Sequence, residues 1–522
     1  MDKVTIRVSR EDGLGLKEAL ALLAGKLSVE SLSTEQKNYI SGKIDAQALE
    51  LILEKNGRYQ LEETPIVITR PCVIEGNGSV FIGSDAMGAI VMSSNVSFRN
   101  LCFDHFRVCA AIVNQSDGRL RNISFLGCAF KNCSKQAVSA GSTQSNGIIE
   151  DIRIDHCDFC GAEGQFDDST GGTCMIGLQA ATLAGMAPVN NCLLENVWIS
   201  NCHFHGKFRI AVQVFCGVGD GLLDGNLPLC SGNEVRNIQI TGNVIENSFD
   251  AAINIIAASL NQTAATVHDL KISGNKIKHG IWGIYMTGCE PVIGCGDNGK
   301  VYNVEISDNE LEPTENVGEI TVGIAIQAGR IDYFDGTSCL DSSVENVKMV
   351  GNTLRKMDQG IFISGADILF DAPDNLVKNC RAENITVENN AFRDVKEVVV
   401  IAGSQHEGRR VDWQIGYPPH EKVWGELLEN DDAITCKTCD NYVKGVTVRK
   451  NQIDGYRYKY RVSGLYGLGQ GTGCGNFCED ILFEENQFER GEGRISVKNV
   501  FVDDRLHDGG GNEVKNIQCK KQ

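Results

Sequence analysis

Apolar positions recur in a nine-residue unit that repeats along most of the chain. Within each unit the second and fourth residues are apolar, and the ninth is Phe, Ile or Leu. This period of two is typical of a β-strand that buries one face. The full units begin at Asn95, Asn122, Asp151, Asn196, Asn237, Asp269, Asn303, Asn346, Asn384, Gly445 and Asp480, and a truncated unit begins at Asn516.

The seventh position of the unit changes once along the chain. It is Leu or Cys in the early units and Asn in all later ones: Leu101, Cys128, Cys157, Cys202, Asn243, Asn275, Asn309, Asn352, Asn390, Asn451 and Asn486. Stacked asparagines can bond each other's side-chain amides, and a small cysteine can fill the same place. The repeat therefore predicts an all-β fold, a right-handed parallel β-helix of about twelve turns.

A further apolar strand follows each unit, and the surplus residues come after it. We expect insertions at 161–175, 216–233, 288–300, 328–343, 365–379 and 404–441. Residues 1–60 differ, because the segments 11–27 and 45–57 carry helical spacing. We therefore divide the chain into a helical N-terminal cap, 1–60, and a β-helix, 61–522.

Charge and composition limit the classes of partner and the location that we expect. A net charge of −19 disfavours nucleic acid and anionic membranes as partners. We find no apolar stretch of the roughly 18–20 residues that a membrane span needs, and no apolar leader at the N-terminus. The expected location is cytoplasmic, where the 21 cysteines would remain thiols.

The repeated N-[IV]-x-[IV]-x-x-N-x-[FI] units, the opening EDGLGLKEAL and the later GRYQLEETPIVITRPCVIEGNG resemble the pectate-lyase-like β-helix superfamily. The resemblance covers roughly residues 1–20 and 56–520. It implies a carbohydrate-active β-helix and a homo-oligomer, since members of this superfamily are often trimers. The superfamily includes lyases, glycoside hydrolases, fructotransferases, epimerases and non-catalytic adhesins, so it implies a fold and leaves the reaction open.

Stacking the strands that follow each unit gives columns of residues expected on the outside of the β-helix. One column holds Arg209, Asp250, Thr321 and Asp358; a second holds the small residues Ala211, Ala252, Gly283, Gly323 and Gly360; the next two contain Gln213, Asn254 and Tyr285, then Gln327. A small-residue floor beside planar polar groups and an aromatic ring resembles a sugar-binding groove. We predict Arg209, Gln213, Asn254, Tyr285, Gln327 and Arg330 as substrate-binding residues.

Cleavage of a glycosidic bond needs two carboxyl groups, roughly 5 Å apart for retention or about 6.5–9.5 Å for inversion. Asp250 is the first candidate because it lies in the groove column immediately before a strand. Asp332 and Asp335, in the loop GRIDYFDG, are the other predicted catalytic residues, and Glu290 is a further candidate. The aromatic side chains of the 404–441 insertion could stack on sugar rings or hold that loop against the β-helix.

Metal and cofactor motifs are weak. The pairs Cys436/Cys439 and Cys157/Cys160 are each a lone C-x-x-C, whereas zinc needs four ligands together. We therefore predict no metal and no cofactor. The favoured function is an intracellular glycoside hydrolase or glycosyl-transferring enzyme acting on an oligosaccharide. The alternatives are a polysaccharide lyase or uronate epimerase, with Arg209 and Tyr285 assisting, and a non-catalytic carbohydrate-binding or structural β-helix.

Overall fold

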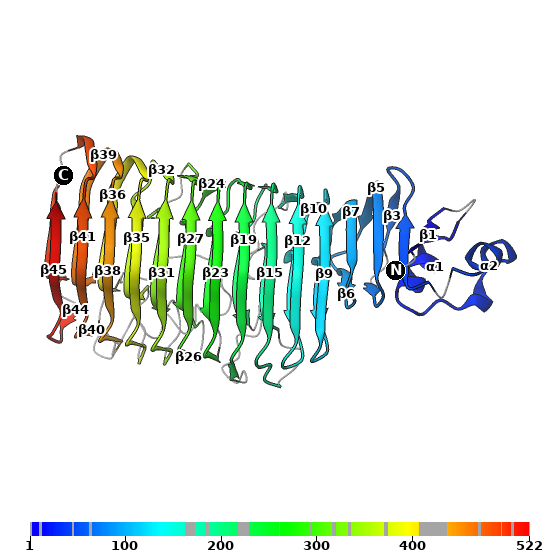
Figure 1. The fold of residues 1–522 in the computed structure, drawn as a ribbon, viewed down its shortest axis with the longest axis horizontal. Helices are drawn as coiled ribbons and strands as arrows, with labels where there is room; N and C mark the ends of the chain where they lie inside the picture. The colour runs from blue at the N-terminus through cyan, green and yellow to red at the C-terminus, as the bar shows by residue number, and fades with distance from the viewer. Residues whose placement is uncertain are drawn as a thin grey trace, which may run out of the picture.

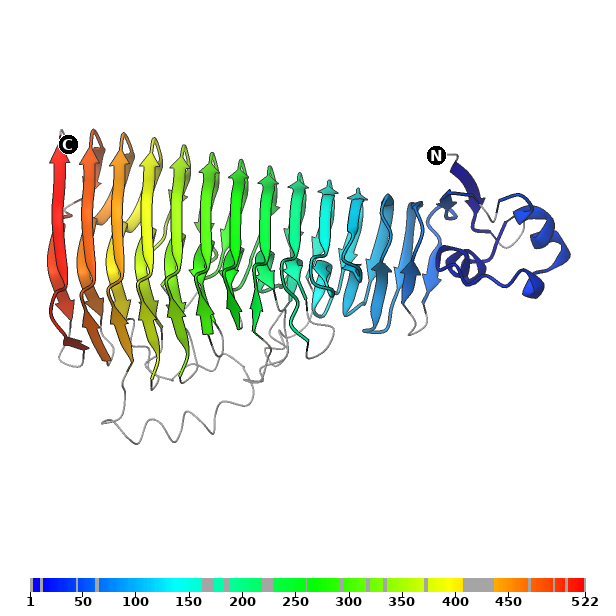
Figure 2. The ribbon, with the colours of Figure 1, turned by 60° about the horizontal axis from the view of Figure 1, so that its bottom comes forward.

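The protein, described from a computed structural model, is a long rod of parallel strands with its helices at the N-terminal end (Figures 1 and 2). The structure describes residues 3–520 apart from 10–12, 44–45, 62–64, 162–172, 183–186, 218–228, 260, 292–294, 316–319, 332–335, 370–373, 407–435, 468–470, 492 and 503–505. Each turn of the chain adds one strand to each of several stacks, so the predicted right-handed parallel β-helix is confirmed.

The first stack contains the recurring unit. Its strands are β1 (Lys3–Arg7), β2 (Ala48–Ile52), β5 (Cys72–Ile82), β7 (Val96–Asp104), β9 (Arg119–Leu126), β12 (Ile148–Asp155), β15 (Leu193–Ser200), β19 (Glu234–Thr241), β23 (Thr266–Ser273), β27 (Lys300–Ser307), β31 (Ser343–Val350), β35 (Arg381–Glu388), β38 (Tyr442–Arg449), β41 (Phe477–Glu484) and β45 (Glu513–Lys520). Most of these strands begin three residues before the unit. The first residue of the unit then lies inside the strand at positive φ, as at Asn122 (φ 56°), a conformation that Asn and Asp tolerate.

The second stack is short and contains the last two residues of the unit, as in β10, where they are Ala129 and Phe130. Its strands are β3 (Arg58–Gln60), β10 (Ala129–Lys131), β13 (Asp158–Cys160), β16 (His203–His205), β20 (Val244–Ile245), β24 (Lys276–His279), β28 (Glu310–Pro313), β32 (Thr353–Arg355) and β42 (Gln487–Gly491). The ends of β5 and β7 and the beginnings of two long third-stack strands, β36 and β39, complete it.

The third stack holds the strand predicted to follow each unit. It consists of β4 (Ile66–Ile68), β6 (Met87–Val91), β8 (Val108–Asn114), β11 (Gln136–Ser142), β14 (Cys174–Ala181), β17 (Ile210–Gly217), β21 (Ala251–Ala258), β25 (Trp282–Cys289), β29 (Val322–Ile331), β33 (Gln359–Ile368), β36 (Ala391–His406), β39 (Gln452–Gly467) and β43 (Ile495–Val502). Strands β29, β33 and β36 continue into segments expected to be insertions, at 328–331, 365–368 and 404–406.

The fourth stack is a separate eight-stranded sheet of short strands, whereas the other three are joined in one sheet of 37 strands. It consists of β18 (Cys230–Ser231), β22 (Gln262–Thr263), β26 (Cys295–Asp297), β30 (Ser338–Leu340), β34 (Leu376–Lys378), β37 (Lys437–Cys439), β40 (Gly471–Cys474) and β44 (Leu506–Asp508).

The interior contains the predicted ladder at the seventh position of the unit. The Asn309 backbone N–H donates to Asn352 Oδ1 at 3.0 Å, and Asn309 Nδ2 donates to the Ile272 carbonyl at 2.9 Å. The ninth position supplies a stack of rings, with Phe159 centred 4.6 Å from Phe204. The buried side-chain amides of the ladder are therefore satisfied by bonds to neighbouring turns.

A column of glycines lets the third stack touch the first across the interior. A Cβ on Gly365 would lie 2.6 Å from the Tyr442 backbone nitrogen, and one on Gly403 would lie 2.7 Å from that of Phe477. The same conflict occurs at Gly288 and Gly464. Only glycine allows so close an approach of two backbones, so the β-helix is pinched along this line.

The N-terminal segment contains two short helices, α1 (Leu16–Leu23) and α2 (Thr34–Ile40), and a 3₁₀ turn, Val29–Ser31. The predicted helix over 45–57 is wrong: its centre is the strand β2, in which Leu49 and Leu51 are buried. Because β1 and β2 pair with each other, the parallel sheet reaches back into residues 1–60. Among the described residues, no helix is long and apolar enough to cross a membrane.

The cysteines depart from expectation at one pair. Cys439 on β37 and Cys474 on the neighbouring strand β40 form a disulfide, whereas all cysteines were expected to be thiols. Most of the other cysteines in the described part of the chain are buried.

Candidate functional site

The outer face of the third stack holds most of the predicted site residues. Gln213 pairs with Asn254, Asn254 with Tyr285, and Tyr285 with Ala325, as the stacked columns predict. The neighbouring column brings Thr287 beside Gln327. Side chains from several turns therefore line one continuous outer surface.

The predicted floor of small residues is wrong, because that column points inward. Ala211 and Ala252 belong to the interior core, and a Cβ on Gly323 would meet Leu354 Cδ2 at 2.6 Å. Strict alternation fails at the start of the strand, where Ala252 and Ile253 both face the interior. The outer surface instead has an apolar floor, formed by the buried side chains Phe215, Ala251, Ile256, Ile281, Trp282, Tyr285, Val322, Ala325, Phe362 and Val400.

This outer surface is concave. Trp282 pairs with Val322, and Arg330 lies eight residues beyond Val322, about 26 Å along a straight strand. Two side chains cannot span that length, yet the Arg330 guanidinium carbon lies 5.0 Å from the centre of the Trp282 ring. The third-stack strands therefore bend, and we call their concave outer face the groove.

A buried polar cluster lies in the groove, near the ends of β29 and β33. Arg330 Nη1 lies 3.4 Å from Asp367 Oδ2 and donates to Gln327 Oε1 at 3.3 Å. Gln327 Nε2 donates to the same Asp367 oxygen at 2.8 Å. The guanidinium also lies 5.4 Å from the Tyr285 ring. Asp367 is fully buried, so its charge depends on this pairing.

Tyr285 connects the cluster to a second carboxyl group. Its hydroxyl donates to Glu290 Oε2 at 2.6 Å, and Glu290 is half-buried. Two carboxyl groups, a guanidinium and two aromatic rings thus lie together, which we call the Arg330 cluster: Trp282, Tyr285, Glu290, Gln327, Arg330 and Asp367. Asp367 was missed because residues 365–379 were expected to form an insertion, whereas β33 continues to Ile368.

Asp250 lies one turn before Trp282 and pairs with Arg209, whose Nε donates to Asp250 Oδ2 at 3.0 Å. Both side chains are partly exposed, at 22% and 29%. The structure therefore joins two predicted residues of one column in an ion pair. The predicted Asp332 and Asp335, and the aromatic residues Trp413, Tyr417 and Trp424, lie outside the described residues.

Asp358, the last predicted residue of the same column, forms another ion pair. Lys396 binds Asp358 Oδ1, and Thr321 Oγ1 donates to Asp358 Oδ2 at 3.0 Å. Burial alone would raise the pKa of Asp358, but the bonds from Lys396 and Thr321 hold that pKa below its usual value. Asp358 is therefore a charged structural partner rather than a proton donor. A hollow of about 420 Å³ adjoins it.

Nearer the N-terminal end, the outer face of the third stack has a hollow of about 450 Å³ lined by β8, β11 and β14. Buried polar atoms along the outer face of the third stack have no hydrogen-bond partner among the described residues: Gln136 Nε2, Gln179 Oε1, Asn254 Oδ1 and Ser364 Oγ. Buried polar groups are nearly always hydrogen-bonded, so several unsatisfied ones on one face mark a place where a polar ligand would fit.

No model of a known protein family matches the chain, and no curated protein sequence matches it. Solved structures that match include tailspike protein 3 of bacteriophage CBA120, at 14% identity and a TM-score of 0.32 over 71% of this chain. The chain spans about half of that tailspike, 54% of its length. These values are too low to carry an argument about function.

Two further matches are of the same kind. A mannuronic-acid-specific family 6 polysaccharide lyase from the human gut microbiota is 12% identical, with a TM-score of 0.30 over 93% of this chain and 87% of the lyase. The surface protein and adhesin PfbA of Streptococcus pneumoniae is 11% identical, with a TM-score of 0.32 over 90% of this chain and 99% of the adhesin. The assignment of the β-helix rests on the strand pairing of this chain itself.

Proposed function

We propose that the protein is carbohydrate-active and binds an oligosaccharide along the groove of the third stack. The observation that carries the proposal is the set of unsatisfied polar atoms on Gln136, Gln179, Asn254 and Ser364, on the outer face of the third stack. Sugar hydroxyl groups both donate and accept hydrogen bonds, so a glycan can satisfy amide N–H, amide C=O and hydroxyl groups. The apolar floor and the Trp282 and Tyr285 rings suit the apolar faces of sugar rings.

Within this groove we propose glycosidic bond cleavage at the Arg330 cluster. Glu290 is half-buried and so accessible to a ligand, and it would act as general acid and base. Arg330 and Gln327 both contact Asp367 Oδ2, an arrangement that suits a carboxylate stabilising positive charge that develops on the sugar. Asp332 and Asp335 follow Arg330 closely in the chain and stay candidates for a further carboxyl group.

A neutral oligosaccharide fits this site better than a polyanion. The charge of Arg330 is already balanced by Asp367, and the chain as a whole carries a net charge of −19. A uronate polymer would bring further negative charge to a groove that holds Glu290, Asp367 and Asp250. We therefore propose a neutral glycan as the substrate.

The test is release of reducing sugar from a panel of neutral oligosaccharides. Glu290→Gln and Asp367→Asn should each lower kcat by about 100-fold or more, the usual contribution of a general acid or base. Glu312→Gln is the matched control, because Glu312 binds Lys356 in the separate hollow beside Asp358. Glu290→Gln with full activity would refute cleavage at this cluster.

Binding is tested separately from cleavage. Gln179→Ala should weaken glycan binding, whereas Gln239→Ala, on β19 of the first stack, should not. Binding without turnover in the wild type would identify a non-catalytic carbohydrate-binding β-helix. Equal affinity in wild type and Gln179→Ala would refute the groove as the binding surface.

One observation favours a lyase or epimerase as the second candidate. Arg330 lies beside the Tyr285 ring, and an arginine next to a tyrosine suits neutralisation of a uronate carboxylate with the phenol as base. Such an enzyme would form an unsaturated or inverted uronate from a uronan. Ultraviolet absorption by an unsaturated product, abolished in Tyr285→Phe, would replace the hydrolase assignment.

A further inference from the structure

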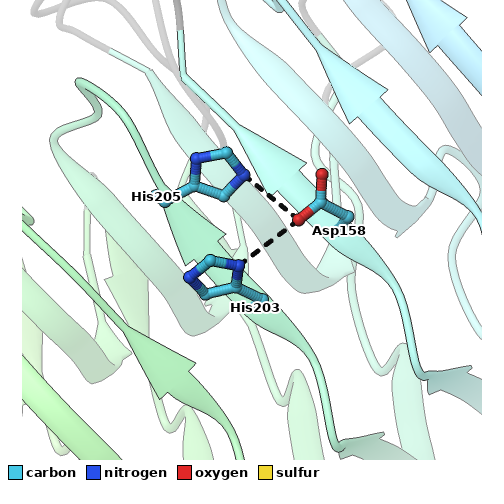
Figure 3. A group of neighbouring side chains, drawn as sticks. All are labelled: Asp158, His203 and His205. Atoms are coloured by element: carbon cyan, nitrogen blue, oxygen red, sulfur yellow. Dashed lines mark hydrogen bonds and ion pairs between the residues drawn. The ribbon is translucent and has the colours of Figure 1, made fainter.

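We propose that Asp158, His203 and His205 form a binding site for a divalent transition-metal ion on the outer face of the second stack (Figure 3). Strands β13 and β16 pair in parallel, so that Asp158 lies beside His203 and Cys160 beside His205. Alternation along β16 places both imidazoles on one face, while Phe204 between them is buried in the core. This site is separate from the groove of the third stack.

The donor atoms have the spacing that a metal ion requires. His205 Nε2 lies 3.1 Å from Asp158 Oδ1, and His203 Nδ1 lies 3.5 Å from the same oxygen. Zinc–ligand bonds of about 2.0–2.1 Å at tetrahedral angles place neighbouring donors about 3.3 Å apart. One donor atom from each of the three residues lies within 4.8 Å of the others. A small shift of the two rings would therefore bring all three donors onto one ion.

A second carboxylate holds one imidazole in the required orientation. His203 Nε2 lies 3.2 Å from Glu246 Oε2, in the loop after β20. With a proton on Nε2 for this bond, the Nδ1 lone pair of His203 points toward Asp158 and a metal. Carboxylates in this outer position typically orient metal-bound histidines and raise their basicity.

A hydrogen-bonded surface cluster without a metal is the competing explanation. Elsewhere a single histidine contacts acids in that way, as His268 does with Glu234 and Asp269. Among the described residues, only the Asp158 group gathers three donors of metal-ligating type. Two imidazoles stacked at 4.5 Å beside one carboxylate are arranged for a shared cation, whereas one imidazole would be enough for a simple ion pair.

The ligand set indicates which ions fit. Two imidazoles and one carboxylate suit zinc and also ferrous iron, which occurs with this set in open sites. Three protein donors leave at least one position for water or another ligand. In the sequence this site is marked by His203 and His205, which flank Phe204, the last residue of a repeating unit. It was not predicted, because the metal motifs considered there were cysteine pairs.

The experiment measures zinc bound per chain by equilibrium dialysis of the full, untagged protein. Wild type should bind one more equivalent than the double variant His203→Ala, His205→Ala and than Asp158→Asn. His268→Ala is the matched control and should retain that equivalent. Glu246→Gln should weaken binding and keep the stoichiometry. Circular dichroism and melting of each variant establish that it is folded.

Cobalt substitution distinguishes this site from the many thiols. Cobalt held by imidazole and carboxylate lacks the intense charge-transfer absorption of a cobalt–thiolate bond. The equivalent lost in the double variant should therefore be the one without thiolate absorption. Equal zinc stoichiometry and affinity in wild type and the double variant, or a lost equivalent with thiolate absorption, would overturn the proposal.

Discussion

The early and late turns of the β-helix fill the same interior position with different chemistry. In the early turns Cys157 Sγ donates to the Phe125 carbonyl at 3.4 Å, and Cys202 Sγ to the Ile154 carbonyl at 3.7 Å. In the later turns the amide of Asn243 donates to the Ile199 carbonyl at 3.0 Å. In each case the acceptor is the fourth residue of the preceding unit. At these turns cysteine and asparagine thus make the same bond to the preceding turn.

Asparagine adds a second function that cysteine lacks. Its Oδ1 accepts the backbone N–H of the preceding turn, and this holds even at the junction, where the Cys202 N–H donates to Asn243 Oδ1 at 2.9 Å. Burial and a bond to Cys157 raise the pKa of the Cys128 thiol, so it stays protonated. The later turns are thus joined by more and shorter hydrogen bonds than the early ones, and we expect them to be the more stable half.

The largest effect is expected for Asn352→Ala. The change removes the acceptor of the Asn309 N–H and the donor to the Ile306 carbonyl, and leaves both groups buried. At about 1–3 kcal/mol for each unsatisfied group, the local free energy of unfolding should fall by about 4 kcal/mol. Hydrogen exchange of the Asn309 amide measures it, and Lys348→Ala on the exposed face of β31 is the control.

The second-largest effect is expected from acid, which should destabilise the later turns. Burial lowers the pKa of His279 from 6.5 to about 4. Between pH 6.5 and 4 this histidine is protonated in the unfolded chain and neutral in the folded protein. The free energy of unfolding is therefore highest above pH 6.5 and falls by about 3 kcal/mol as the pH drops from 6.5 to 4. His279→Leu should remove this part of the pH dependence of chemical denaturation, and His268→Leu should not.

Cys157→Ala should have a smaller effect than the asparagine change. It removes weak S–H bonds and one sulfur atom from the core, which costs about 1 kcal/mol. Hydrogen exchange of the neighbouring turns measures the loss. A cost equal to that of Asn352→Ala would show that the two halves do not differ as we infer.

Cys157→Asn should have the smallest effect, within about 1 kcal/mol of zero. The new amide can reach the Phe125 carbonyl, and its oxygen can accept the backbone N–H of Cys128, so this turn would gain the bonds that an asparagine makes in the later turns. Slower exchange of the Cys128 amide is the expected sign. Faster exchange there would mean that the early turns are shaped for sulfur.

The ladder could be predicted because each column repeats at one place in every unit. Strict alternation was a weaker guide: it placed Ala252 outside the β-helix, whereas Ala252 and Ile253 both face inward at a bend. The helix predicted over 45–57 rested on apolar residues at helical i, i+3 and i+4 spacing, but Leu49 and Leu51 also follow a period of two and pack in a strand.

The candidate site was predicted in part for a similar reason. Tyr285 and Gln327 lie in columns of neighbouring turns, so stacking placed them near each other, and Arg330 was predicted from the loop that follows Gln327 in the chain. Their contact with Trp282 depends on a bend that no pattern in the sequence marks. The contact between Asp158 and His205 joins residues 47 positions apart, and it follows from the repeat, because Asp158 and His203 both hold the eighth position of the unit and pair with each other.

The close approach of the third and first stacks at the glycine column also offers a way to recognise related proteins. Any added side chain at Gly365, Gly403 or Gly464 would strike the backbone of the opposite stack, so drift at these sites is barred while the groove residues are free to change. Related chains that have exchanged one substrate for another should therefore still share a glycine late in this strand and an asparagine at the seventh position of the unit. These two marks trace ancestry independently of function.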